Sequence, residues 1–114
     1  MSNKKNRNKP VITIVTKMQM PPDHAKLWLE KKGCSEDGIG TMFYCKIAYK
    51  GKKDIPMLAP SVFSNTQVKI IRERFGKDQI EPLLAAQAKE DIKAIFSKNG
   101  DKILETFERA SKEI

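Results

Sequence analysis

The fold is decided by the ten residues from Thr41 to Lys50, which read TMFYCKIAYK. Side chains alternate along a β-strand, so every second residue faces the same side. One side of this stretch is apolar and consists of Phe43, Cys45, Ile47 and Tyr49. The other side mixes apolar and basic residues: Met42, Tyr44, Lys46, Ala48 and Lys50. We therefore predict a strand with one buried face that ends in a lysine-rich turn, Lys50-Gly51-Lys52-Lys53.

The chain before this strand contains a second strand and a helix. Residues 11–17 are rich in β-branched side chains, with apolar residues on both faces, which predicts a central or doubly covered strand. Pro21 and Pro22 end that strand, and a helix from about Pro22 to Lys32 follows, with Gly33 after its last turn. This strand–helix–strand run is long enough for a right-handed crossover between parallel strands, and an antiparallel arrangement also fits it.

After the turn, residues 55–58 predict a short third strand that Pro56 confines to a sheet edge. Ser64 and Gln67 have the spacing of a capping box, which predicts a helix from Asn65 to Phe75. Apolar residues at helical spacing predict a second helix over residues 82–98, and Asp101 starts a third after Asn99-Gly100.

These elements predict a small α+β fold in the order β-α-β-β-α-α-α. Its sheet has two to three strands, with one crossover helix and a C-terminal helical block. We expect one domain over residues 11–114, because 114 residues suit a single core. Residues 1–10 contain hardly any apolar side chains and are expected to form a disordered basic arm.

The opening of the chain is similar to that of a glutaredoxin or thioredoxin-like domain. In those families a strand, a redox loop with Cys-Pro-x-Cys and a helix follow one another, as do the predicted strand, break and helix in residues 11–33. Met20-Pro21-Pro22-Asp23 stands at the place of the redox motif, so both cysteines are absent. The resemblance implies a thioredoxin-like topology as the alternative fold, and it does not extend to thiol exchange.

No motif in the chain names a reaction, and we expect a protein that is not an enzyme. His24 is the single histidine, and Cys34 and Cys45 form no Cys-x-x-Cys pair, so neither a zinc site nor another metal or cofactor site is predicted. Reduced thiols and the lack of a long apolar segment favour an intracellular, cytoplasmic protein without a membrane span. An enzyme whose site combines residues far apart in sequence is a third hypothesis.

Charge is distributed unevenly, and this asymmetry favours an anionic partner. Residues 1–77 hold 16 Lys/Arg against 6 Asp/Glu, whereas residues 78–114 hold 6 against 8. We predict binding to nucleic acid, DNA or RNA, mainly through its phosphate backbone, because lysine outnumbers arginine. The hypothesis requires the basic residues to converge into one stripe. The candidate residues are Lys4, Lys5, Arg7, Lys9, Lys50, Lys52, Lys53, Lys69, Arg72, Arg74 and Lys77.

The second hypothesis is a protein-interaction module or inhibitor that acts through its C-terminal helices or through its basic surface. Residues 82–114 are nearly balanced in charge and carry apolar stripes, which would suit a homodimer or a protein partner. The same stripes also fit a simpler role, in which they cover the sheet.

Overall fold

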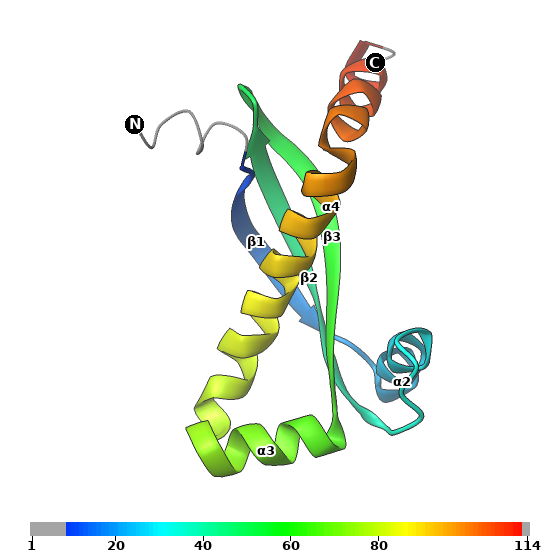
Figure 1. The fold of residues 1–114 in the computed structure, drawn as a ribbon, viewed down its shortest axis with the longest axis vertical. Coiled ribbons are helices and arrows are strands. Elements are labelled where there is room, and N and C mark those ends of the chain that lie inside the picture. The colour runs from blue at the N-terminus through cyan, green and yellow to red at the C-terminus, as the bar shows by residue number, and fades with distance from the viewer. Residues whose placement is uncertain (1–8, 113–114) are drawn as a thin grey trace.

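The computed structural model describes residues 9–112. The expected arm over residues 1–10 therefore lies almost wholly outside the described residues. Three strands and three α-helices form an α+β fold with a long C-terminal helix, in agreement with the predicted order (Figure 1). In chain order the elements are β1 (Val11–Gln19), α2 (Pro22–Lys31), β2 (Gly38–Tyr49), β3 (Lys52–Ser64), α3 (Asn65–Phe75), the 3-10 turn η1 (Lys77–Gln79) and α4 (Ile80–Lys112).

The three strands form one antiparallel sheet in the order β1-β2-β3. The predicted strand, β2, lies in the middle, and Phe43, Cys45, Ile47 and Tyr49 are all buried on one face, as the alternation predicted. The prediction of a central or doubly covered β1 was wrong. β1 is an edge strand, and seven of its nine residues are exposed because no helix covers its outer face.

The parallel crossover and the thioredoxin-like alternative were also wrong, because β1 and β2 are antiparallel. Their pairing continues to the end of the strands, where the Met20 N–H donates to the Gly40 carbonyl at 2.9 Å. The chain therefore reverses within residues 20–37. α2 lies at the end of the sheet where this reversal occurs, instead of crossing over it.

β3 is an edge strand as predicted, but it is much longer than the predicted four residues. Pro56 and Pro60 lie inside it, and a proline has no N–H for the ladder. The Val62 carbonyl accepts a hydrogen bond from Gln87 Nε2 on α4, so the backbone groups of Val62 face away from β2. Pro56 and Pro60 are separated from Val62 by an even number of residues, so their backbone groups also face away from β2. The strand therefore continues through both prolines without losing a hydrogen bond to β2.

The capping box is present, and α3 has the predicted bounds. Ser64 Oγ accepts from the Gln67 N–H at 3.2 Å, and the Ser64 N–H donates to Gln67 Oε1 at 2.9 Å. Glu36 supports the same helix end, because its carboxylate accepts from both the N–H and the hydroxyl of Thr66. The predicted break at Asn99-Gly100 is present within α4, because two helical segments meet there at a kink where Asn99 is non-helical (φ −131°, ψ 19°).

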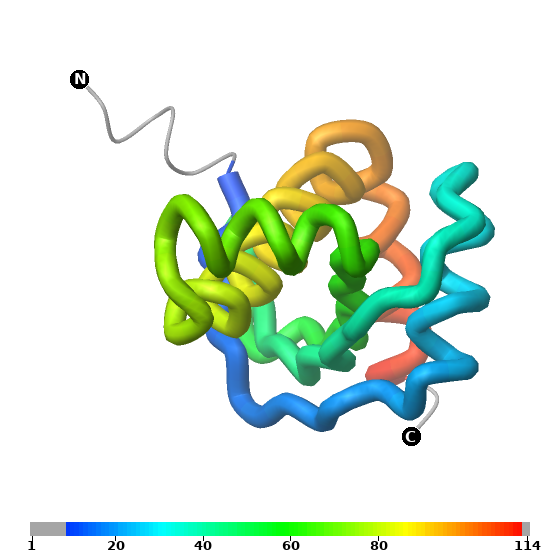
Figure 2. The backbone as a smooth tube through the Cα atoms, turned by 90° about the horizontal axis from the view of Figure 1, so that it is seen from below, coloured from blue at the N-terminus to red at the C-terminus, as the bar shows by residue number. Residues whose placement is uncertain are grey.

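Helices cover the two faces of the sheet unequally. On one face, α4 and β2 share the main core, in which Phe43, Ile47, Ile92 and Phe96 are almost fully buried. On the other face, α2 forms a smaller cluster at one end with Met20, Ala25, Leu29 and Val62. Seen along the long axis, α3 and the first half of α4 lie on the opposite side of the strands from the chain that leads from β1 into α2 (Figure 2).

Candidate nucleic-acid interface

The part of the sheet that α2 leaves uncovered presents a continuous face to solvent, here called the open face. The strand register places its residues in rows across the three strands. Thr16, Tyr44 and Leu58 form one row, and Leu58 is 63% exposed. Thr13, Lys46 and Pro56 form the next row, and all three are exposed. Val11 and Ala48 close the face at the end where the chain enters β1.

A shallow hollow of about 220 Å³ lies at this end of the open face. Lys46 and Lys53 line it together with Thr13, Ala48 and Asp54. No ion pair within residues 9–112 involves Lys46 or Lys53, so two ammonium groups face one acid here. Lys9 precedes β1 by two residues and is exposed. The combination of two lysines, a hydroxyl and open space suits a phosphate group.

The three hairpin lysines do not act together. Lys50 Nζ lies 2.7 Å from Asp101 of α4, and Lys52 Nζ lies 3.4 Å from Glu108 of the same helix. The hydrogen bond to Asp101 raises the pKa of Lys50 above its ordinary value. Only Lys53 of the three lines the hollow on the open face. Carboxylates of the C-terminal helix therefore neutralise two of the predicted site residues.

The predicted basic residues of the second half form a separate group. Lys69, Arg72 and Arg74 are exposed on α3, and Lys77 follows in η1. Glu73 and Asp78 are interspersed among them. α3 and the β2–β3 hairpin lie at opposite ends of the molecule, whose longest dimension is 44 Å (Figure 1). The hairpin and α3 groups thus do not merge into one stripe, so the candidate residues in the described part of the chain do not form the single interface that the hypothesis requires. Lys4, Lys5 and Arg7 lie outside the described residues.

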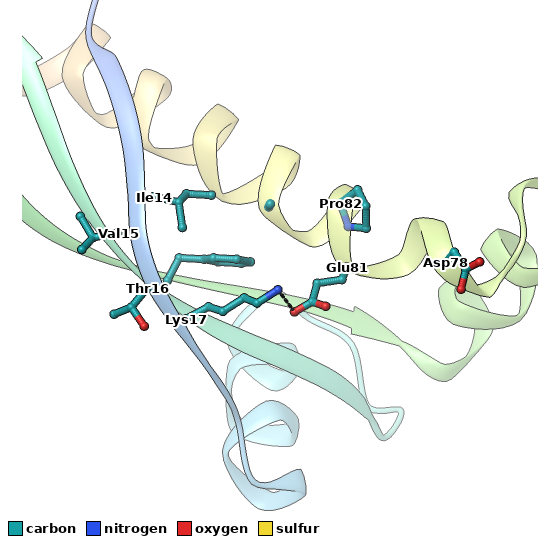
Figure 3. A pocket seen from close by; sticks show the side chains of 9 residues that line it. Ile14, Val15, Thr16, Lys17, Asp78, Glu81 and Pro82 are labelled. Atoms are coloured by element: carbon teal, nitrogen blue, oxygen red, sulfur yellow. Dashed lines mark ion pairs between the residues drawn. The ribbon is translucent and has the colours of Figure 1, made fainter.

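A larger hollow, of about 670 Å³, lies on the opposite face between β1 and α4. Its apolar floor includes Ile14, Phe43 and Ala85. Lys17 reaches across from β1 and pairs with Glu81 at 2.6 Å, so its charge is neutralised (Figure 3). Asp78 adds a further carboxylate to the rim. This hollow does not suit a polyanion, although it is larger than the one on the open face.

Residues 82–114 mainly cover the sheet. Leu84, Ala88, Ile92 and Phe96 face the core and are at most 3% exposed, as expected of a helix that packs on a sheet. Beyond the kink at Asn99 the helix is less covered, and Ile103, Leu104 and Phe107 are half-buried. A second groove of about 420 Å³ lies there between α4 and β3, lined by Ile55, Pro56, Ile103, Phe107 and Ala110 among others.

The two thiols differ in environment, although both are free. Cys45 is fully buried beneath α4, and this burial raises the pKa of its thiol, an effect that nearby Lys89 partly offsets. Cys34 is half-buried in the loop after α2. Because the thiolate is the reactive form, Cys45 is chemically protected in the folded protein.

We expect one thiol per chain to react rapidly with an aromatic disulfide reagent at pH 8. The second, Cys45, should react only after denaturant is added, since both its burial and its raised pKa reduce the accessible thiolate. A time course of absorbance with and without guanidinium measures this, and Cys34→Ser should abolish the rapid phase. Two equally rapid thiols in the native protein would contradict the packing of β2 under α4.

The described residues were also compared with the requirements of a metal site and of a membrane-spanning helix. Among residues 9–112, no three His, Cys, Asp or Glu side chains are grouped as a metal site would require. The helices of the same range include none that is both long enough and apolar enough to cross a bilayer. Even α4, with 33 residues, carries charged side chains along most of its length.

Two residues of the open face were missing from the predicted site. Tyr44 and Lys46 were predicted to lie on the mixed face of β2, but neither was among the candidate residues. Tyr49 is in fact a core residue whose ring meets Phe96 edge to face at 5.0 Å. The alternation of β2 already placed Tyr44 and Lys46 together on the face away from the core, so both could have been included among the candidate residues.

Comparison of the chain with protein-family models, curated proteins and solved structures gave no significant match.

Proposed function

We propose that this protein binds nucleic acid through the open face of its sheet, mainly by contacts between lysines and phosphates. The observation that carries the proposal is the placement of Lys46 and Lys53 on one hollow without an ion-pair partner among the described residues. The helices leave this face free, so an extended ligand has access to it.

The basic residues of the N-terminal sequence also favour binding at the open face. The chain enters β1 at Val11, directly beside Ala48 and the hollow. Lys9 precedes this corner, and Lys4, Lys5 and Arg7 follow further toward the N-terminus in sequence. Each phosphate that a lysine or arginine neutralises releases counterions, so even a few such contacts give measurable affinity at low salt. We also infer a cytoplasmic location, where reduced cysteines such as Cys34 and Cys45 are usual.

The charge reversal Lys46→Glu with Lys53→Glu is expected to reduce affinity for a labelled oligonucleotide at least tenfold at about 0.1 M salt. Loss of two phosphate contacts should also flatten the slope of log affinity against log salt by roughly 1.4–1.8. Fluorescence anisotropy at several salt concentrations measures both quantities. Circular dichroism checks that the variant is folded.

Two matched variants sharpen this test. Lys98→Glu with Lys112→Glu reverses the same charge at exposed positions on α4 and should leave most of the affinity. Lys69→Glu with Arg74→Glu reverses the same number of charges on α3. If the α4 pair weakens binding as much as the open-face pair, net charge alone explains the binding. A larger loss from the α3 pair would place the interface on α3 and contradict the proposal.

A second candidate function is self-association or protein binding through the C-terminal half of α4. The groove between Ile55 of β3 and Ile103 and Phe107 of α4 favours it, because apolar side chains line a surface that the fold leaves partly uncovered. Sedimentation equilibrium should then detect a concentration-dependent dimer that Phe107→Asp abolishes. Ala110→Arg alters the same groove at an exposed position and should act alike without disturbing the core. A monomer at all concentrations would exclude self-association.

A further inference from the structure

Tyr44 is the one aromatic residue that the strand register places on the open face. It lies in the middle strand, with Thr16 of β1 and Leu58 of β3 as its cross-strand neighbours. Thr16 is short and Leu58 is 63% exposed, and the tyrosine itself is half-buried. The backbone beneath Tyr44 is paired on both sides and is therefore rigid. Tyr44 thus offers a preorganised aromatic surface in the centre of the face.

An aromatic surface of this kind distinguishes unpaired bases from paired ones. In a duplex each base is already stacked between its neighbours, whereas a single strand can turn a base outward onto an aromatic side chain. Every base has a π-face, so such stacking depends little on sequence. The open face carries lysines but no arginine, which suits backbone contacts more than bidentate reading of base edges.

The hollow with Lys46 and Lys53 begins one row beyond Tyr44. Residues i and i+2 of a strand are roughly 6.6 Å apart, so Lys46 follows Tyr44 at that spacing on the same face. This separation is close enough for a base on Tyr44 and the adjoining phosphate near Lys46 to belong to the same strand. Asp54 also lines the hollow, so the phosphate must lie toward Thr13 and the two lysines.

We propose that the ligand of the open face is a single strand of nucleic acid, with a base stacked on Tyr44 and the adjoining phosphate held between Lys46 and Lys53. This inference rests on the proposed function and adds its substrate class. The same chemistry serves single-stranded DNA and single-stranded RNA. Contacts to the 2′-hydroxyl group would distinguish single-stranded RNA from single-stranded DNA.

The test measures affinity by fluorescence anisotropy for a labelled 12-nucleotide dT strand, a 12-nucleotide U strand and a 12-base-pair duplex. We expect the single strands to bind more tightly than the duplex. Tyr44→Leu keeps an apolar, strand-compatible side chain and removes the π-face. It should lower single-strand affinity roughly tenfold to 100-fold, because one stacked base is lost, and leave duplex affinity nearly unchanged. Tyr44→Phe keeps the ring and should bind single strands nearly as the unmodified protein does.

The outcomes separate this inference from the proposed function. If both single strands and duplex bind equally, or if Tyr44→Leu binds single strands normally while the Lys46 and Lys53 variant does not, the inference is wrong and backbone binding stands. If none of the three probes binds even at low salt, the proposed function itself fails. A clear preference between the dT and U strands, with Tyr44→Leu impaired toward the preferred one, supports the inference, and a 12-nucleotide dU strand then separates the effect of the sugar from that of the thymine methyl group.

Discussion

Replacing Phe96 by alanine is expected to lower the free energy of unfolding by about 3–5 kcal/mol, because the change leaves a cavity in the main core. Phe96 is 2% exposed and lies on α4 one turn before the kink at Asn99. Its ring meets Tyr49 of β2 edge to face with centroids 5.0 Å apart, so the substitution also removes an aromatic pair. Urea denaturation followed by circular dichroism measures the loss.

Ile95 provides the matched control, because it precedes Phe96 on the same turn and is 43% exposed. Ile95→Ala should cost less than about 1 kcal/mol, as expected where side-chain removal leaves no enclosed cavity. Phe96→Leu fills most of the space and gives a folded variant if the alanine variant unfolds. Equal losses at residues 95 and 96 would mean that α4 does not pack on the sheet through the face described here.

Replacing Gly38 by alanine is expected to cost about 3 kcal/mol, the upper end of the usual range for overpacking. Gly38 opens β2 opposite Ser64, at the point where β3 passes into α3. An added Cβ would collide with the carbonyl oxygen of Phe63 and lie 2.7 Å from Leu29 Cδ1 of α2. A backbone carbonyl cannot move aside by rotation of a side chain, so the β2–β3 pairing must open locally. Thermal unfolding followed by circular dichroism measures the loss.

Gly33→Ala is the control for this substitution. Gly33 has a positive φ of 83°, but no atom lies within 4 Å of an added Cβ. Its replacement should therefore cost only the left-handed backbone penalty, roughly 1–2 kcal/mol. If Gly33→Ala proves more damaging than Gly38→Ala, the close approach of β2, β3 and α2 at this corner is wrong.

Helices and strands that are determined by contacts between residues close in sequence were predicted correctly. Ser64 and Gln67 determine where α3 begins, because both hydrogen bonds of the capping box form within one turn. The alternation in residues 41–50 predicted both faces of β2, since one face of that strand is buried and a shift by one residue would expose it.

The pairing of distant segments was harder to predict. The connection between β1 and β2 is long enough for parallel or antiparallel pairing, and no residue within it selects one. The third strand was predicted to span only residues 55–58, although β3 continues through Pro56 and Pro60 because their missing N–H groups face the open edge of the strand. Whether a proline interrupts a sheet depends on the register, which the sequence alone does not specify.

The direction of each hairpin lysine was likewise unpredictable from its position in sequence. Lys50 and Gly51 both have positive φ values, which form a tight two-residue turn between β2 and β3. Lys52 is opposite Tyr49 and pairs with Glu108 of α4, whereas Lys53, the next residue, points to the other face and lines the hollow. The register shift opposite Ala48 adds Asp54 beside Lys53 and returns Ile55 to the core.

Nuclear magnetic resonance titration of the isotopically labelled protein with a 12-nucleotide single strand tests the location of the interface most directly. We expect the largest backbone amide shifts at Thr13, Tyr44, Lys46 and Lys53, and only small shifts in α3. If the largest shifts fall instead on residues 65–77, or if saturating strand shifts no amide of β2, nucleic acid does not bind the uncovered side of this sheet.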